Sequence, residues 1–470
     1  MKTSLYHLIL TLLGPHCCLS LLVQPCPKTC TCDQDPTYSS GLRVNCSNAD
    51  LLEVPWDIPV GTTTLLLRDN HFEILHNSSF ASLTQLRTLD LSFNRIAHME
   101  ENAFEGLETL LLLDLRRNVL TLSRKTYLER VFQPLASLKT LFLNRNSYAS
   151  AYRREPPVLT SQSHGEDDES VPRSTGNVPK SSPLSLKAAD GKSVESESET
   201  LRLNGTEINT SVTGHVKDKL ELSNADLTYP DDALSHLHNL VELHLDGLKD
   251  TAFGPGFLNL SNLTVLSLQG FCHLGALDNT TFLNTPHVQQ LNLSECDIIE
   301  VTRDAFSTLT DLRELDLSYN QKLGLDRLGD AFEGLSKTRL ERLVIDAMVP
   351  IRNLGIIVNS THLRHFKDLN HLKVVQARFN RIEAFDDGVL CTELPPNLKH
   401  VYLNANMLVL ASYVNDLKCL ESLELLHING FDTYWTPPLR PPDPEDVRTR
   451  TKSCAKQVPG NGGTAEEAAA

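Results

Sequence analysis

The sequence predicts an α/β solenoid with a parallel sheet along one face and a disulfide cap at its N-terminal end. Three features predict this fold: a recurring frame of leucine and asparagine, four cysteines before its first copy, and an apolar leader before the cysteines. The frame reads L-x-x-L-x-L-x-x-N. Its clearest copies run from Leu86 to Asn94, Leu110 to Asn118, Leu138 to Asn146 and Leu312 to Asn320.

The spacing within this frame decides the architecture. Leucines two residues apart lie on one face of a short strand and point into a core, and the asparagine hydrogen-bonds neighbouring backbone at the turn that follows. One copy cannot bury its apolar face alone, so the copies must stack and the asparagines form a ladder. This is the signature of a leucine-rich repeat, and it predicts a horseshoe with a parallel concave sheet. Such an array holds other molecules and seldom carries out chemistry.

The frame recurs over residues 62–146 and again over 217–435, with thirteen starts that make about a dozen repeats. The starts fall near residues 62, 86, 110, 138, 217, 240, 263, 288, 312, 340, 372, 398 and 423. Other residues take the place of the asparagine in several copies, namely Ala225, Leu248, Cys296 and Met348. The second half of several repeats carries a phenylalanine that we expect on the convex side of the core, as at Phe104, Phe306 and Phe332.

Residues 1–24 read as a secretory signal peptide and residues 25–61 as a cysteine cap. Lys2 precedes the apolar stretch from Leu5 to Leu13, which is too short to span a bilayer. Four cysteines suffice for a zinc site, but a pair of disulfides suits a secreted chain whose first repeat needs a cover. We therefore expect disulfides among Cys26, Cys30, Cys32 and Cys46.

Two segments interrupt the repeats. Residues 147–216 and 436–470 are rich in Ser, Pro, Gly and charged residues, and they contain too little apolar surface to offset the entropy of ordering. We expect both to be disordered, the first as an insertion and the second as a tail. The array then ends without a second cysteine cover, which suggests an incomplete chain or an alternative isoform.

Four later cysteines fall in neighbouring repeats. Cys272 and Cys296 are 24 residues apart, and Cys391 and Cys419 are 28 apart. Equivalent positions of adjacent strands lie about 4.8 Å apart, within reach of a disulfide, so each pair is either bonded or a pair of buried thiols. Cys454 is left without a partner in this scheme.

Nine N-x-S/T motifs and the signal peptide predict a glycoprotein. Asn292 is the informative acceptor, because it lies between Leu291 and Leu293 and so points out of the sheet. A glycan there would obstruct the middle of the sheet and favour binding on a flank or on the convex side. The nine motifs begin at Asn45, Asn77, Asn204, Asn209, Asn259, Asn262, Asn279, Asn292 and Asn359.

No catalytic motif is present, and we predict no enzyme, metal or cofactor. His236 and His238 are interpreted as a solvated pair rather than a metal site. The acidic residues Asp90, Asp114, Asp316 and Asp346 are expected outward on the strands, either as a ligand-facing ladder or as a solvated face. The net charge of −16 argues against a general nucleic-acid binder, which needs a cationic surface.

The cysteine run CPKTCTC, the runs LDLSFNRI and LDLSYN, and the stretch FGPGFLNLSNLTVLSL resemble a Toll-like receptor ectodomain. The resemblance covers about residues 26–435 without the insertion. It implies binding of protein or microbial ligands, a receptor dimer on ligand binding, and signalling through a membrane span and a TIR domain. This chain lacks a C-terminal cysteine cap, a span and a TIR domain, so any membrane attachment would come through a segment outside it. Ligand-contact residues differ among family members and are not transferred.

Two functions follow as hypotheses. The first is the extracellular ligand-recognition part of a Toll-like innate immune receptor. Such a chain would enter the secretory pathway and end up extracellular or on the extracellular side of the plasma membrane. The alternative is a secreted matrix or adhesion protein built from leucine-rich repeats.

Overall fold

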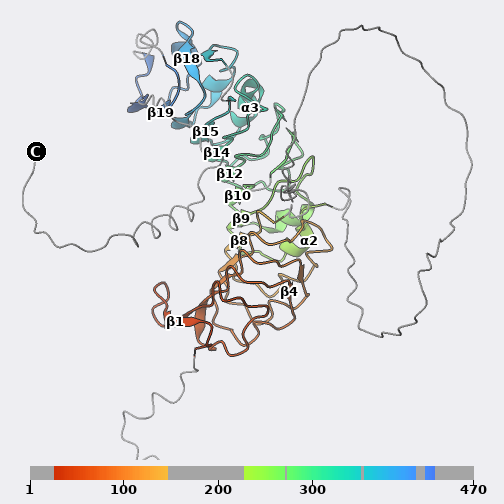
Figure 1. Cartoon of the computed structure of the whole chain (residues 1–470). Helices are drawn as coiled ribbons and strands as arrows, with labels where there is room; N and C mark the ends of the chain where they lie inside the picture. The colour runs from red at the N-terminus through yellow and green to blue at the C-terminus, as the bar shows by residue number, and fades with distance from the viewer. Residues whose placement is uncertain (1–25, 147–226, 270–271, 351–353, 409–418, 429–470) are drawn as a thin grey trace, which may run out of the picture. The chain divides into compact units, whose positions relative to one another are not determined.

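The computed structural model describes residues 26–146, 227–269, 272–350, 354–408 and 419–428. Within them one sheet of fourteen strands runs through the whole set of repeats (Figure 1). Its strands, in spatial order, are β1 (Thr31–Gln34), β2 (Leu42–Asn45), β3 (Thr62–Leu66), β5 (Thr88–Asp90), β7 (Leu112–Asp114), β8 (Thr140–Phe142), β9 (Glu242–His244), β10 (Val265–Ser267), β12 (Gln290–Asn292), β14 (Glu314–Asp316), β15 (Arg342–Val344), β17 (Val374–Gln376), β19 (His400–Tyr402) and β20 (Leu425–His427).

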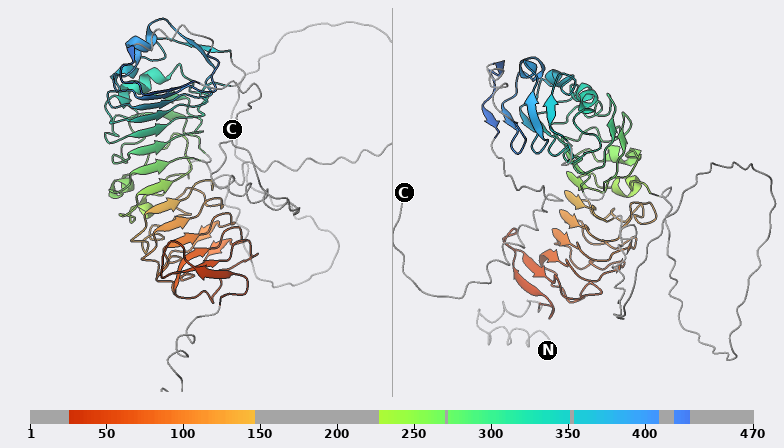
Figure 2. Two further views of the ribbon diagram at one scale, coloured as in Figure 1. Left: turned by 90° about the vertical axis from the view of Figure 1, so that its left-hand side faces the viewer. Right: turned by 45° about the horizontal axis from the view of Figure 1, so that its top comes forward.

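All neighbouring strands of this sheet are parallel except β1 and β2 of the cap. Figure 2 shows the strands lying side by side along the repeats. The strands β3 to β20 make twelve repeat strands among the described residues. The predicted parallel solenoid is therefore confirmed.

Smaller elements lie in the return segments that connect one strand to the next. Among the described residues, three two-stranded sheets pair β4 (Ile74–Leu75) with β6 (His98–Met99), β11 (Ala276–Leu277) with β13 (Glu300–Val301), and β16 (Ile356–Val358) with β18 (Ile382–Phe385). The helical turns are α2 (Asp231–Leu234), η2 (Pro255–Asn259), α3 (Leu328–Leu335), η3 (Phe366–Asp368) and α4 (Val389–Glu393).

The core between the sheet and the return segments consists of the frame leucines and a stack of aromatic rings. Leu86, Leu89 and Leu91 are fully buried, and the equivalent leucines of the other turns are buried as well. On the return side, the rings of Phe282 and Phe306 lie 6.0 Å apart and nearly parallel. Each turn thus covers the apolar surface of the next, as stacked repeats require.

The predicted asparagine ladder is present. Asn94 Nδ2 donates to the carbonyls of Leu67 and Leu91 at 3.1 and 2.9 Å, and its Oδ1 accepts the N–H of Phe72 at 3.3 Å. Asn118, Asn320 and Asn406 repeat this arrangement. The amide satisfies backbone groups that the turn leaves unpaired and that would otherwise be costly to bury.

The predicted repeat start near residue 217 lies outside the described residues and adds no strand between β8 and β9. Thr140, Leu141 and Phe142 of β8 pair directly with Glu242, Leu243 and His244 of β9. The twelve repeat strands of the described residues confirm the predicted array of about a dozen repeats. At this junction the buried Asp246 carboxylate accepts the N–H of Asn146 at 2.8 Å, as a ladder asparagine would.

The N-terminal cap closes on the first repeat through two disulfides, Cys26–Cys32 and Cys30–Cys46. Cys46 is buried, and β2 pairs in parallel with β3, so the cap extends the sheet and covers its end. The disulfide interpretation of the four cysteines is confirmed over the zinc alternative. The predicted signal peptide, the 147–216 insertion and the 436–470 tail lie outside the described residues.

Candidate functional site

A groove of about 490 Å³ lies over the outward face of the sheet, from β9 to β17. Outward side chains alternate with the buried leucines along each strand, so every turn contributes two of them to this surface. The groove is lined by the side chains of Gln290, Asn292, Glu314, Asp316, Arg342 and Val344, with others at its rim.

The register places an acidic strand at the centre of the groove. Glu314 of β14 lies between Gln290 of β12 and Arg342 of β15, and Asp316 lies between Asn292 and Val344. Burial raises the pKa of Asp316 above its ordinary value of 3.8. The groove therefore combines one partly desolvated carboxylate (Asp316), one exposed carboxylate (Glu314), amides and guanidinium groups, which suits a polar ligand with hydrogen-bonding groups.

An ion pair closes one side of the groove. Arg378 Nε and Nη2 lie 2.8 and 2.6 Å from Asp346 Oδ2, and the Arg378 N–H donates to Asp346 Oδ1 at 2.7 Å. The Asp346 carboxylate is only 6% exposed, so this pair is better shielded from solvent than a surface ion pair. It fixes the turn after β15 to the turn after β17.

The four acidic residues that we predicted on outward strand positions do not all occupy the same position of the repeat. Asp90, Asp114 and Asp316 end their strands, and each accepts the N–H two residues further on, from Ser92, Arg116 and Ser318 respectively. Asp346 lies two residues beyond the end of β15, which corrects its assignment to an outward strand position. The first three carboxylates thus hold turns in place as well as facing outward.

Asp90 contributes a pH-dependent cost to stability. Burial and then the neighbouring Asp114 carboxylate raise the pKa of Asp90 above its ordinary value of 3.8. The folded chain therefore binds this proton more tightly than the unfolded chain does. The ionised Asp90 carboxylate therefore lowers the free energy of unfolding at pH values above its folded-state pKa. This destabilisation is absent at pH values below 3.8, its ordinary pKa.

We expect Asp90→Asn in a Ser92→Ala background to raise the melting temperature near pH 7 relative to Ser92→Ala alone. The background is needed because Asp90→Asn would otherwise create a glycan acceptor with Ser92. Both chains lack the Ser92 hydroxyl, so the cost of its loss cancels in the comparison. Thermal melts over a pH series should show the gain shrinking toward pH 3.8. A gain that stays constant with pH would show that the charge of the Asp90 carboxylate is not what destabilises the chain.

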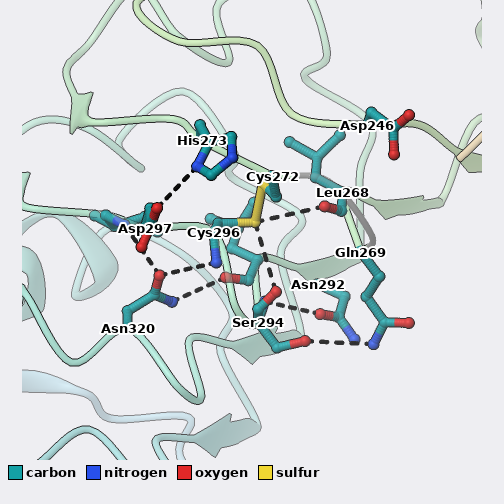
Figure 3. Close-up of a disulfide and its surroundings, with 12 residues drawn as sticks. Asp246, Leu268, Gln269, Cys272, His273, Asn292, Ser294, Cys296, Asp297 and Asn320 are labelled. Atoms are coloured by element: carbon teal, nitrogen blue, oxygen red, sulfur yellow. Dashed lines mark hydrogen bonds and ion pairs between the residues drawn. A yellow bond between two sulfur atoms is a disulfide. The ribbon is translucent and has the colours of Figure 1, made fainter. Parts of the chain in front are cut away.

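Two further disulfides join adjacent turns, Cys272–Cys296 and Cys391–Cys419. Figure 3 shows the first beside the ladder: Asn320 Oδ1 accepts the Cys296 N–H at 3.1 Å, and the sulfur takes the space of a ladder amide. The neighbouring His273 Nδ1 and Asp297 Oδ2 lie 2.8 Å apart. The disulfide thus replaces the missing asparagine of this turn. Cys454 lies outside the described residues.

The glycan acceptors divide between two surfaces. Asn292 lines the groove, and Asn45 occupies the matching outward position of β2, beside Leu66 of β3. Between them, strands β3 to β10 carry no acceptor motif at their outward positions. The exposed acceptors Asn77, Asn259, Asn262 and Asn279 lie on return segments, whereas Asn359 is half-buried. Asn204 and Asn209 lie outside the described residues. Glycosylation at each acceptor stays a prediction.

The predicted weak histidine pair does not converge on a carboxylate cluster. His236 is half-buried, with a ring nitrogen that has no hydrogen-bond partner, and His238 Nδ1 lies 3.4 Å from the Asn259 carbonyl. In the described ranges, no group of three or more His, Cys, Asp or Glu side chains has the spacing of a metal site. No helix in those ranges has the length and apolar character needed to cross a bilayer.

Sequence reasoning missed several groove residues, namely Arg342, Tyr319 and Arg378. Each occupies an outward position of the frame or of the turn after it. The frame offers a signal for them only once the strand register is known, because the outward positions tolerate any polar residue.

Known proteins resemble the chain over parts of its length. A family model described as leucine rich repeat matches residues 61–120 and 261–321, and one described as leucine rich repeat N-terminal domain matches residues 25–59. Neither indicates an enzymatic family.

Three relatives illustrate the range of similarity. The chain is 28% identical to Toll-like receptor 4 of Pinctada imbricata over 222 residues, which is 47% of this chain and 24% of that protein. It is 47% identical to leucine-rich repeat-containing protein 3B of Homo sapiens over 94 residues, 20% of this chain and 35% of that protein. It is 26% identical to podocan of Mus musculus over 381 residues, 77% of this chain and 51% of that protein. The chain thus matches about a quarter to a half of each relative's length.

Proposed function

The chain belongs to the leucine-rich repeat family and carries that family's N-terminal domain, and from this premise we propose that it is the extracellular ligand-recognition part of a Toll-like innate immune receptor. It binds microbial products on the repeat surface, with no reaction, and the receptor dimerises on ligand binding. The observation that carries the proposal is the outward sheet face, where a polar groove crosses six repeat strands. Because Asn292 lines this groove, binding there requires that Asn292 carries no glycan, and it replaces the expectation of binding on a flank or on the convex side. The match to a Toll-like receptor over 47% of the chain supports the receptor class.

Extracellular recognition also fits the covalent chemistry of the chain. Four disulfides join residues of the cap and of neighbouring turns, as expected for a protein of an oxidising compartment. Acceptor motifs at exposed return-segment positions are compatible with the same route of synthesis.

A secreted matrix or adhesion protein is the second candidate. The match to podocan spans 77% of this chain, a larger share than the Toll-like match, so the repeat arrangement over the whole array does not favour the receptor class alone. In this role the same outward face would bind a structural polymer.

A binding screen distinguishes the two candidates. The full secreted chain is passed over immobilised lipopolysaccharide, lipopeptide and flagellin on one side, and over fibrillar collagen on the other. Saturable binding to a microbial product, without binding to collagen, supports the receptor proposal. Binding to collagen alone would replace it with the matrix role, and binding to neither class would count against both.

A further inference from the structure

Four polar side chains in the groove have no partner within the protein, and we call them the free groove residues. Gln290, Glu314 and Arg342 are the first outward residues of the consecutive strands β12, β14 and β15. The fourth, Gln376, is the second outward residue of β17. Among the described residues, none of the four side chains makes a hydrogen bond or a short ion pair with another group. Their hydrogen-bonding capacity is therefore available to a ligand.

The free groove residues are accessible and supply both donors and acceptors. Gln290 and Glu314 are exposed, and Arg342 is half-buried. The Glu314 carboxylate only accepts hydrogen bonds, the Arg342 guanidinium only donates them, and an amide side chain does both. Asn292 adds a further donor, because its Oδ1 accepts the N–H of Ser294 at 3.0 Å and its Nδ2 makes no bond among the described residues.

The charges of the groove nearly balance. Its lining contains three carboxylates, of Glu314, Asp316 and Asp346, and two guanidinium groups, of Arg342 and Arg378. Asp346 and Arg378 bind each other, as described above. At the β9 end, His244 Nε2 lies 2.8 Å from the Glu242 carboxylate, so that ring is occupied as well. A polyanion would meet Glu314 and Asp316, and a polycation would meet Arg342, so the balance favours a ligand without net charge.

The position of the groove disfavours a peptide. It lies on a sheet face, where the backbone groups of each strand already pair with the strands on both sides, so a peptide cannot bind as an added strand. The apolar side chains of the floor are buried frame leucines and the half-buried Val265 and Val344. A large aromatic or aliphatic anchor, of the kind that dominates protein interfaces, has little depth to enter there.

Aromatic rings line the rim of the groove. Tyr319 and Phe379 line it from the turns after β14 and β17, and both are half-buried. Each has left-handed backbone, with φ of 63° and 60°, directly before the ladder asparagine of its turn. The face of an aromatic ring carries partial negative charge and attracts polarised C–H groups. A sugar ring presents such C–H groups on its faces and hydroxyl groups around its edge.

We propose that the groove binds a neutral, polyhydroxylated glycan. Each sugar hydroxyl donates one hydrogen bond and accepts up to two, which matches the mixture of donors and acceptors on the free groove residues. Neighbouring strands lie about 4.8 Å apart, close to the length of one sugar unit in an extended glycan, so successive strands can bind successive sugars. This inference rests on the proposed recognition function and names the ligand class of its groove.

Binding of the full secreted chain to neutral polysaccharides tests the proposal. The probes are dextran, pullulan and soluble β-1,3-glucan, which are of microbial origin, and galactomannan, which is of plant origin. We expect saturable binding of at least one of them. Binding of none would overturn the proposal, and so would a glycan found by mass at Asn292 of the secreted chain, because it would fill the groove.

A pair of substitutions places the bound glycan in the groove. Gln290→Ala with Glu314→Ala should weaken binding about tenfold or more, since it removes one neutral and one charged hydrogen-bonding group. Both side chains are exposed and without partners, so the melting temperature should not change. The matched control is Gln85→Ala with Glu108→Ala, which removes the same two residue types from exposed positions outside the groove. Equal weakening by the two pairs would overturn the groove as the site.

Ionic strength and a conservative substitution test the neutrality of the ligand. Raising the salt from about 0.1 to 1 M shortens the Debye length from about 10 to 3 Å and should leave the affinity for the glycan nearly unchanged. Glu314→Gln keeps an acceptor, so its affinity should lie between those of the unmodified chain and of Glu314→Ala. A tenfold loss of affinity in high salt, or equal losses for Glu314→Gln and Glu314→Ala, would show that charge dominates binding and would overturn the proposal.

The inference and the proposed function fail in different ways. Lipopolysaccharide, lipopeptide or flagellin bound by the chain, with no neutral polysaccharide bound, would overturn the glycan inference alone. Galactomannan bound at the groove, with no microbial product or microbial polysaccharide bound, would overturn the proposed function alone.

Discussion

Asn320→Ala should lower the free energy of unfolding by roughly 3–5 kcal/mol, because it leaves several buried backbone groups unpaired at about 1–3 kcal/mol each. Asn320 Oδ1 accepts the N–H groups of Cys296 and Ile298, both at 3.1 Å. Its Nδ2 donates to the carbonyls of Leu293 and Leu317, at 2.9 and 2.8 Å. No neighbouring side chain can replace an amide that is itself fully buried.

Chemical denaturation of the full chain, together with amide hydrogen exchange, measures this effect. The Cys296 and Ile298 amides should lose protection first, because they lose their acceptor directly. Asn239→Ala is the matched control, since that amide is exposed and makes one hydrogen bond, to the Ala136 carbonyl. A similar loss of stability in both variants would show that the ladder amide has no special role.

Phe306→Ala should have a comparable effect, a loss of about 3–5 kcal/mol, because it empties a fully buried position in the aromatic stack. The Phe306 ring lies 6.0 Å from that of Phe282 in the preceding turn. Since each repeat contacts only its neighbours, the damage should be concentrated in the turns of β12 and β14. Amides of β5 and β7 should keep their protection in hydrogen exchange.

Phe306→Leu provides the comparison for that experiment. Leucine restores most of the buried volume, so its cost should be well below that of alanine. Equal costs for the two substitutions would mean that the cavity is not what destabilises the chain. Uniform loss of protection along the whole sheet would contradict nearest-neighbour stacking.

The buried positions of each repeat could be predicted from the sequence, because burial restricts which residue types each of them accepts. Leu315, Leu317 and Asn320 each occupy a position that only a core residue or a ladder amide satisfies, so their spacing specifies the strand and turn. The phenylalanine of the return segment was predictable for the same reason.

The contacts of the outward half could not be predicted, because its residues interact with neighbours 25 to 32 positions away in the sequence. Arg378 joins Asp346 and Phe93 joins Arg68 only after the turns have stacked in register. The frame start near residue 217 shows the same limit, since Leu220 and Leu222 satisfy the leucine pattern while β8 pairs with β9. The spacing of leucines within one repeat does not determine which strand of another repeat pairs with it.

We propose that this chain recognises its ligands on the outward sheet face. Engineered glycans test it directly. Asp90→Asn and Asp316→Asn each create an N-x-S acceptor at an outward strand position. Ser82→Asn and Glu300→Asn create acceptors at exposed positions of the return segments.

The measurement is binding of each variant, with glycan occupancy checked by mass, to the microbial product or collagen that the unmodified chain binds in the screen. We expect a glycan at one or both sheet-face positions to abolish binding of this ligand, whereas both return-segment glycans should leave binding intact. Binding that survives both sheet-face glycans and is lost with a return-segment glycan would contradict the proposal.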